Sequence, residues 1–452
     1  MRLSVKNISE HIRLKRGLDI SISGEAERIT AHRFAPEGLF SLRCADFRGM
    51  EPRLLVKEGD RVLAGSPLWC DASRTEIKFA SPVCGTVEAI VRDGDGRLQE
   101  VKVRASGEKE HVPFKIPRPA AMKRSEIVQL MLDGGLWPAI VQRPFGVVAD
   151  PEAVPKAIFI SAFSSAPLDA DYDYSLSSRF EDIQAGIDIL SRLTMGGVHL
   201  ALPAGNYAGT VFHKLKGAVF HSFYGPHPAG NVGVQIASIS PIRKGDIIWT
   251  VPLEMTAVIG RFFLKGAYDL SRKVAVAGPA AEKPAYADCV AGCPLETFAP
   301  WLDNARGPYR IVCGNILSGR SADRSGNLGF FDNLITLVPE NGGEDEFMGW
   351  VRALGSPFRP SGASGADTST GGTPAPFIVN DIYDKVLPVK IFPVNLFKAC
   401  EMGDIKGMEE CGIYEVTEED VALCEYVCPS KIGIQELITK GIGLMLEKGE
   451  QG

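Results

Sequence analysis

The residues with the clearest chemical potential lie in a turn at the middle of the chain, Gly225–Gly233 (GPHPAGNVG). His227 stands between two prolines, which fix the backbone and keep the histidine out of the α region. A glycine-rich turn before an apolar run can present backbone N–H groups to a phosphate. The same pattern also suits a stiff turn between a strand and a helix. In that case we expect His227 and the nearby His221 to be neutral, hydrogen-bonded structural residues.

Two C-x3-C pairs, Cys289–Cys293 and Cys424–Cys428, are the next candidates for chemistry. The second pair (CEYVCP) matches the last third of a ferredoxin-type C-x2-C-x2-C-x3-C-P run. The first two cysteines of such a run would stand where this chain has Glu418 and Val421. Two thiolates cannot hold a [4Fe–4S] cluster. We therefore expect both pairs to be structural, and neither a metal nor a cluster to be bound.

A nucleotide site is also absent from the place where an α/β fold would have one. The segment Ala157–Ala162 is typical of a buried strand, and a phosphate-binding loop would follow it with glycines. The loop Ser161–Asp173 instead has no glycine and three aspartates. Carboxylates there would repel a pyrophosphate, which argues against NAD binding. Ser-His-Asp, H-E-x-x-H and P-loop patterns are missing too, so we predict no catalytic residue in this chain.

Length and composition frame these observations. The 452 residues predict roughly three or four domains, and 45% hydrophobic residues suffice for several cores. A net charge of −6 without a long basic run argues against nucleic acid as a partner. Neither a membrane-spanning stretch of about 20 apolar residues nor a signal peptide is evident. We expect a cytoplasmic protein that can dock on an integral membrane partner.

Residues 1–118 are dominated by short strands and turns. Arg53–Leu68 (RLLVKEGDRVLAGSPL) followed by Ser81–Val87 (SPVCGTV) resembles the biotinyl/lipoyl-type barrel-sandwich hybrid. In carrier domains of that type the modified lysine stands eleven residues before the glycine of the second motif, and this chain has Arg74 there. A guanidinium cannot be the acylated amine. The resemblance thus implies the fold without the carrier function.

Residues 119–253 alternate helix and strand, which is typical of a Rossmann-like α/β domain. A short amphipathic helix is expected over Ser125–Leu132. A longer one is expected over Leu176–Leu190, ended by Gly196-Gly197. The expected strands are Ala157–Ala162, Val198–Leu202, Ala218–Phe223 and Asp246–Val251.

The last part of the chain divides into three predicted units. Residues 254–339 form a glycine-punctuated small domain that resembles the β-grasp-like SLBB module. Residues 340–380 form a loop-rich connector, and residues 381–452 form a helical C-terminal domain. In that domain Thr417 is expected to cap a helix whose first turn is acidic (Glu418, Glu419, Asp420).

Six motifs, spread in order over nearly the whole chain, together resemble one family, the A subunits of the Na⁺-translocating NADH:quinone oxidoreductase (Na⁺-NQR). They are Lys15–Gly24 (KRGLDISISG), Gly135–Phe145 (GLWPAIVQRPF), Gly225–Gly233, Phe347–Trp350 (FMGW), Tyr383–Pro388 (YDKVLP) and Glu419–Pro429 (EDVALCEYVCP).

That family is in turn similar to the NADH- and flavin-binding subunit of respiratory complex I, which has a glycine-rich flavin loop in place of Gly135–Phe145. Trp137, Arg143 and other bulky residues replace those glycines here. The resemblance implies a multidomain α/β and α+β scaffold that retains no flavin, NADH or iron–sulfur site. It implies a peripheral subunit on the cytoplasmic side of the bacterial inner membrane. The partners would be five other subunits, some in the membrane, in a complex that oxidises NADH, reduces ubiquinone or a related quinone and exports Na⁺.

The resemblance also implies an association with quinone, which needs an apolar slot and one or two donors for its carbonyl oxygens. Leu42–Met50 and Trp137–Phe145 have that composition. Arg43 or Arg143 would donate, and the slot would be lined by Phe47, Met50, Trp137 and Phe145. Each of these residues also suits ordinary packing. Two alternatives therefore stay open: a purely structural docking subunit, and an autonomous flavin-dependent NADH dehydrogenase, against which the altered loops argue.

Overall fold

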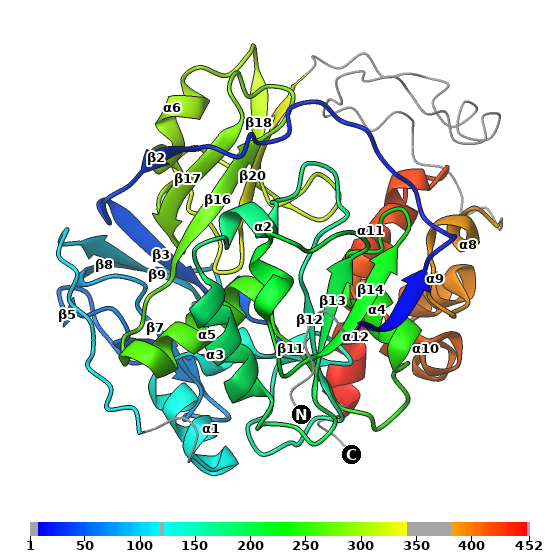
Figure 1. The fold of residues 1–452 in the computed structure, drawn as a ribbon, viewed down its shortest axis with the longest axis horizontal. Coiled ribbons are helices and arrows are strands. Elements are labelled where there is room, and N and C mark those ends of the chain that lie inside the picture. The colour runs from blue at the N-terminus through cyan, green and yellow to red at the C-terminus, as the bar shows by residue number, and fades with distance from the viewer. Residues whose placement is uncertain (1–7, 118–121, 341–380, 450–452) are drawn as a thin grey trace.

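The computed structural model describes residues 8–117, 122–340 and 381–449. The predicted connector 340–380 and the motif Phe347–Trp350 therefore lie outside the described residues, apart from residue 340. Figure 1 shows the blue strands of residues 39–105 on the left and the C-terminal helices in orange and red on the right. The central α/β sheet lies between them, and a further sheet lies above. Within the described residues, no helix is long and apolar enough to cross a membrane.

Two small antiparallel sheets form the barrel-sandwich part. One has the order β3-β9-β8-β5 and the other β4-β6-β7. Their strands are β3 (Leu39–Arg43), β4 (Pro52–Leu54), β5 (Arg61–Val62), β6 (Pro67–Asp71), β7 (Lys78–Ala80), β8 (Gly85–Arg92) and β9 (Leu98–Ala105). Arg74 lies in the turn between β6 and β7, where its guanidinium is 3.7 Å from Asp71 and 3.7 Å from Asp150.

Residues 8–33 contribute to two other sheets rather than to these. Strand β1 (Ile8–Arg13) pairs in parallel with β14 (Val219–Tyr224) of the α/β sheet. Strand β2 (Thr30–Arg33) pairs in parallel with β17 (Ala285–Val290) of the sheet shown at the top of Figure 1. The N-terminal segment thus ties together sheets whose other strands lie far away in sequence.

The central sheet has the order β1-β14-β13-β12-β15-β10-β11. Strands β12 (Ile158–Ser161), β13 (Val198–Pro203) and β15 (Ile248–Thr250) occur where the apolar runs predicted them. Strands β10 (Val141–Arg143) and β11 (Val147–Val148) extend the edge in antiparallel orientation. From β12 the chain moves first to β13 and β14 on one side and later to β15 on the other. The strand order therefore reverses between β12 and β15, and ligands of open α/β sheets bind at such a point.

Helices flank this sheet. Helix α1 (Arg124–Asp133) matches the predicted amphipathic helix, whereas the helix expected over Leu176–Leu190 is shorter than predicted. A separate short helix, α2 (Tyr172–Ser175), ends where the amides of Ser177 and Arg179 donate to carbonyls three residues back, so α3 begins only at Phe180. Helix α3 ends at Leu190, before Gly196-Gly197, because Arg192 and Leu193 donate to carbonyls three residues back.

Helix α5 (Leu253–Lys265) crosses α3 at very short range, because two glycines face the neighbouring backbone. A Cβ atom on Gly260 would overlap the carbonyl oxygen of Asp182, and one on Gly186 would overlap that of Thr256. The crossing fixes the position of α5, whose first residue Leu253 reaches the candidate site described below.

The turn Gly225–Gly233 leads from β14 into helix α4 (Val232–Ile239), as its apolar continuation predicted. Val234 of α4 packs into the core of the C-terminal helices, whereas Ile236 packs beside Phe159 of the sheet. Helix α4 therefore connects the α/β sheet to the C-terminal domain.

The second large sheet has the order β19-β18-β20-β16-β17-β2. It contains β16 (Ser271–Ala277), β17, β18 (Tyr309–Cys313), β19 (Arg320–Ala322) and β20 (Leu334–Pro339), with the short helix α6 (Ala299–Leu302). Cys289 and Cys293 are buried in the core of this part, 5% and 2% exposed.

The C-terminal domain is helical, as predicted. It comprises α8 (Ile382–Val386), α9 (Pro393–Met402), α10 (Ile405–Cys411), α11 (Glu418–Val427) and α12 (Ile434–Gly449). Thr417 caps α11 in a reciprocal capping box with Asp420, which confirms the predicted cap. Because three acidic residues occupy the first turn of α11, this helix end carries concentrated negative charge next to the α/β domain.

Candidate functional site

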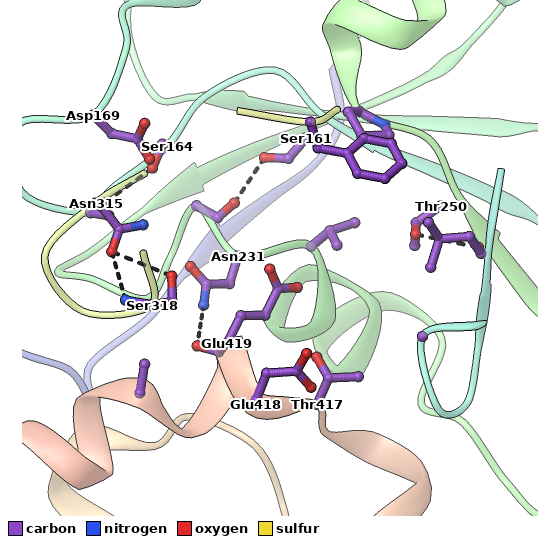
Figure 2. A pocket seen from close by; sticks show the side chains of 18 of the residues that line it. Ser161, Ser164, Asp169, Asn231, Thr250, Asn315, Ser318, Thr417, Glu418 and Glu419 are labelled. Carbon is purple, nitrogen blue, oxygen red and sulfur yellow. Dashed lines mark hydrogen bonds between the residues drawn. The ribbon is translucent and has the colours of Figure 1, made fainter. Parts of the chain in front are cut away.

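The candidate site is a cavity of about 440 Å³ at the carboxyl ends of β12 and β15, where the strand order reverses. Ser161 and Ser164 line it from the end of β12, and Thr250 lines it from the end of β15. Figure 2 shows these side chains around the space, with Asn231 next to them. The cavity thus occupies the position where open α/β sheets hold their ligands.

Two other parts of the molecule complete the cavity. The loop after β18 contributes Asn315 and Ser318, and the N-terminus of α11 contributes Thr417, Glu418 and Glu419 (Figure 2). Three units that are separate in sequence therefore meet at one site, and the cavity depends on how they pack together.

Arg143, at the end of β10, is the central charge beneath this site. Its Nη1 atom donates to Asp420 at 2.9 Å and its Nη2 atom to Glu419 at 2.6 Å. Burial opposes the charge of the guanidinium. However, the charges of Asp420 and Glu419 outweigh burial and raise the pKa of Arg143 above its ordinary value. Both ends of the guanidinium are therefore occupied by carboxylates of the same chain.

The N-terminus of α4 is occupied in a similar way. A Cβ atom on Gly233, in the first turn of α4, would overlap the carboxylate of Asp420. The amide of Asn231, the residue before α4, donates to the backbone carbonyl of Glu419 at 3.0 Å. A helix N-terminus of this kind would otherwise attract an external anion. Here Asp420 lies beside it instead.

The second guanidinium at the cavity, Arg48, joins both of the segments predicted to bind quinone. Its Nη1 atom donates to the carbonyl of Phe145 at 2.9 Å, and its Nη2 atom is 2.5 Å from Glu418. The segments Leu42–Met50 and Trp137–Phe145 are thereby connected at the cavity.

Burial also acts on the carboxyl groups around the cavity. It raises the pKa of Asp169 and, together with the charge of Asp420, that of Glu419. It also raises the pKa of Asp46, although Arg43 opposes the shift. An added negative charge would destabilise these carboxylates further. The electrostatics of the cavity therefore disfavour an anionic ligand.

The six residues predicted to bind quinone lie in different environments, and only Arg143 lines the cavity. Arg43 pairs with Asp46 at 3.5 Å, and Asp46 does line it. Phe47 is buried, with its ring 4.6 Å from that of Phe79. It also packs against Phe331, which borders the cavity. Phe47 is thus one layer behind the wall.

The remaining three candidates do not line the cavity either. Met50 is half-buried against the main core. Trp137 is fully buried, and its indole N–H donates to the carbonyl of Ala149 at 2.7 Å. Phe145 is half-buried with a positive φ of 80°, and its ring is 5.7 Å from that of Tyr414. The two predicted segments meet at one cavity, although mainly through neighbours of the residues predicted to bind.

Sequence reasoning missed the polar lining, notably Asn231, Asn315 and Ser318. In the sequence, the acidic first turn of α11 indicates only the start of a helix. Its three carboxyl groups could nevertheless have indicated a contact site, because so much negative charge at one helix end needs cationic or hydrogen-bonding partners in the fold.

His227 lies at the edge of the cavity and is buried. Its Nδ1 atom is 3.1 Å from the hydroxyl of Ser165, which also accepts from the amide of Gly230 at 2.8 Å. Burial, opposed by the charges of Asp19 and Asp420, lowers the pKa of His227 to about 4. These contacts agree with the predicted structural role of a neutral histidine. His221 has a comparable role, hydrogen-bonded to His199 at 2.9 Å.

This shift predicts an acid-sensitive contribution to stability. Between the ordinary histidine pKa of 6.5 and the folded value of about 4, the unfolded chain binds a proton that the folded chain does not. The free energy of unfolding therefore falls as the pH drops through that window, by roughly 3 kcal/mol from this group. Urea unfolding at several pH values would measure this effect. Over the same pH window the free energy of unfolding of His227→Gln should fall less than that of the wild type, by about that amount. The exposed His111→Gln is the control, and equal slopes for both variants would refute the assignment.

The cysteines of the C-terminal domain are packed inward. Cys424 and Cys428 are both buried, and Cys428 Sγ is 3.1 Å from the hydroxyl of Tyr383. Burial raises the pKa of Cys424, which keeps the thiol protonated. Among the residues that the structure describes, no group of three or more His, Cys, Asp or Glu side chains is arranged to hold a metal ion.

Family models match three successive parts of the chain. Residues 12–106 match the NqrA N-terminal barrel-sandwich hybrid domain, 122–268 the NqrA second alpha/beta domain, and 273–324 the NQRA C-terminal domain. The observed sheets follow the same order. Fold and matches together define a multidomain protein of the NqrA class.

Full-length relatives make the assignment specific. The chain is 30% identical over 460 residues to the A subunit of the Na⁺-translocating NADH-quinone reductase of Rhodopirellula baltica, covering 97% of this chain and 98% of that protein. It is 32% identical to the corresponding protein of Pseudomonas aeruginosa, covering 97% and 100%, and 32% identical to that of Yersinia pestis, covering 93% and 96%. The chain belongs to this family of A subunits, which confirms the resemblance seen in the motifs.

Similarity to solved structures is much weaker. An NAD⁺-reducing [NiFe]-hydrogenase in the H2-reduced state matches 49% of this chain and 47% of its own chain, with 14% identity and a TM-score of 0.35. A match at this level supports no conclusion about the present chain.

Proposed function

We propose that this chain contributes to the quinone-binding step of a Na⁺-translocating NADH:quinone reductase, and that the cavity between β12 and β15 takes the quinone ring. The observation that carries the proposal is the state of the two guanidinium groups at the cavity. Arg143 and Arg48 are both paired with carboxylates of α11, so neither is free to hold a phosphate. A neutral ligand suits such a site better than a nucleotide.

The lining of the cavity supports a ring with two carbonyl acceptors. Phe163, Leu253 and Phe331 supply apolar surface, whereas Asn231 and Asn315 supply amide groups. The Oδ1 atom of Asn315 already accepts from the amides of Leu317 and Ser318, at 2.9 and 3.1 Å. This orientation leaves its NH₂ group as a donor. Apolar walls with a few placed polar groups are typical of sites for small organic ligands.

The proposal extends to the setting of the subunit. The reductase named for the relatives acts on NADH and quinone and moves Na⁺, and we assign this chain to the same kind of complex. We place it as a peripheral subunit on the cytoplasmic side of the bacterial inner membrane, beside five other subunits, some within the membrane. NADH, flavin and iron–sulfur chemistry would belong to those subunits. We also infer that the α/β domain is Rossmann-like and shares ancestry with the flavin-binding subunit of complex I.

The test is a titration of the full chain with a short-chain ubiquinone, in which calorimetry and NMR measure the binding. Saturable binding is expected in the wild type. Ser318→Phe, which adds a ring to an exposed side chain at the cavity rim, is expected to weaken binding at least about tenfold. Ser321→Phe, exposed on β19 and outside the lining, is the matched control.

No saturable binding, or equal affinities for the two variants, would contradict the quinone assignment. The second candidate, a purely structural docking subunit, predicts that negative outcome. Phe392 and Met402, at the two ends of α9, favour docking because they are 64% and 81% exposed and apolar. The same titration therefore separates the two roles.

A further inference from the structure

A second cavity, of about 350 Å³, lies away from the candidate quinone site. It is bounded by the turn between α2 and α3, by α5, and by β16 with the neighbouring ends of β2 and β17. It therefore lies between the α/β domain and the second large sheet, which contains β16 and β17. Its volume is well above that needed for a single water molecule.

The side chains that line this cavity carry a net positive charge. Five basic and two acidic side chains line it: Arg33, Arg179, Arg261, Arg272, Lys273, Glu254 and Asp288. The concentration of guanidinium groups around one enclosed space is the reverse of the situation at the quinone cavity, where carboxylates surround two arginines.

Most of these cations have carboxylate partners. Lys273 is 2.7 Å from Asp288, and Arg261 is 2.5 Å from Asp269. Arg179 is 3.4 Å from Asp182. Together these pairs hold much of the basic rim in a fixed geometry, and they leave its positive charge only partly balanced.

Arg272 is the exception. It is only 8% exposed, yet among the described residues no carboxylate lies within ion-pairing distance of its guanidinium. Its Nη1 atom donates to the carbonyl of Asp332 at 3.2 Å, and its Nη2 atom faces the sulfur of Met255 at 3.8 Å. A buried cation normally has a counter-ion, because leaving it unpaired is costly.

Glu254 does not fill this role. It is 7% exposed, and its Oε1 atom has no hydrogen-bond partner among the described residues. Burial raises its pKa to about 7, although Arg272 acts in the opposite direction. The carboxyl group is thus partly neutral near pH 7 and supplies only part of the charge that Arg272 requires.

We propose that this cavity binds a phosphate group, with Arg272 as its donor and buried anchor. Arg179, Arg261 and Lys273 stay paired with their carboxylates and add only positive charge around it. Guanidinium groups suit phosphate because they offer paired donors to its oxygens. Inorganic phosphate and a small phosphate monoester present the same group, and the cavity has room for either. The site lies between two domains, so that its occupant would fasten one to the other.

The experiment titrates the full chain at low ionic strength with inorganic phosphate, and separately with glycerol phosphate, by calorimetry and ³¹P NMR. Binding with a Kd of about 1 mM or tighter is expected for at least one of them. If only inorganic phosphate binds, free phosphate is the ligand; if glycerol phosphate binds more tightly, a monoester is. Either result supports the site.

Arg272→Met tests the anchor. It removes the buried charge while filling a similar space, so phosphate binding should weaken at least about tenfold. Without phosphate the variant should melt no lower than the wild type, because an unpaired buried cation is lost. Arg92→Met removes an exposed charge at the end of β8 in the barrel-sandwich part, and it should leave phosphate binding unchanged.

Three results would overturn the proposal. One is that neither phosphate compound binds the wild type. Another is that Arg272→Met binds phosphate as the wild type does. The third is that chloride at equal ionic strength displaces phosphate completely, which would mark a diffuse charge effect rather than a built site.

Discussion

Arg143→Met is expected to lower the free energy of unfolding by about 3–5 kcal/mol, the largest effect predicted for a single side chain here. The cost comes mainly from the buried carboxylate that is left without a cation, and less from the hydrogen bonds that are lost. Asp420 is fully buried and accepts from Arg143 at 2.9 Å. Without the guanidinium, its charge and that of Glu419 would remain at the domain boundary without a cation.

Urea and thermal unfolding followed by circular dichroism would measure this loss. The matched control is Arg104→Met, which breaks an ion pair with Glu88 that is about half exposed on both sides. Pairs of that kind contribute at most about 1 kcal/mol. The double variant Arg143→Met with Asp420→Asn should recover part of the loss, because asparagine carries no charge and can still accept from the amide of Thr417. Equal losses for Arg143→Met and Arg104→Met would refute the argument.

The same variant bears on the site. Arg143 holds the first turn of α11 against β10, and that turn supplies Glu418 and Glu419 to the cavity wall. Limited proteolysis of Arg143→Met should therefore release C-terminal fragments earlier than in the wild type. Since α11 closes one side of the cavity, the quinone binding that we propose for this cavity should weaken together with the stability of this contact.

Gly260→Ala is expected to destabilise the protein by about 3 kcal/mol, at the upper end of what overpacking costs. A methyl group at this position of α5 would overlap the backbone carbonyl of Asp182, and would lie 2.5 Å from the amide nitrogen of Gly186. Both are main-chain atoms, which cannot rotate away as a side chain would. The helices would have to separate, which would disturb the buried residues of both.

Gly443→Ala in α12 is the control for this substitution. Gly443 is also inside a helix, but a Cβ atom there would meet nothing within 4 Å. Because alanine favours helix over glycine, this variant should be more stable by up to about 1 kcal/mol. Opposite signs for the two glycine variants would confirm that α3 and α5 depend on close backbone contact. A loss below about 1 kcal/mol for Gly260→Ala would mean that the crossing relaxes easily.

Much of the local structure could be predicted from sequence, because it depends on residues only a few positions apart. The apolar runs at 157–162 and 198–202 became β12 and β13. Thr417 and Asp420 formed the predicted cap, and the turn at Gly225–Gly233 led into α4 as expected. The prediction that one helix spans Leu176–Leu190 was wrong for an equally local reason. The apolar residues keep their helical spacing across residues 176–179, but the backbone there forms a turn that separates α2 from α3.

The family could also be recognised from sequence, since its motifs are short, specific and in order. The prediction that no phosphate binds after β12 rests on three aspartates where glycines would be needed. What those aspartates and the bulky loop Gly135–Phe145 do instead was not visible.

Only the tertiary structure decided how the site is assembled. Arg143 and Asp420 are 277 residues apart, and Arg48 and Glu418 are 370 apart. The N-terminal strands β1 and β2 join sheets formed by much later parts of the chain. Such pairings depend on packing between domains, and no local pattern specifies them. The sequence therefore determined which local elements form and to which family the chain belongs. The packing decided that Asp420 and Glu419 of α11 pair with Arg143 beside the N-terminus of α4. It also buried Arg272 beside a cavity, with no carboxylate of the described residues close enough to pair with it.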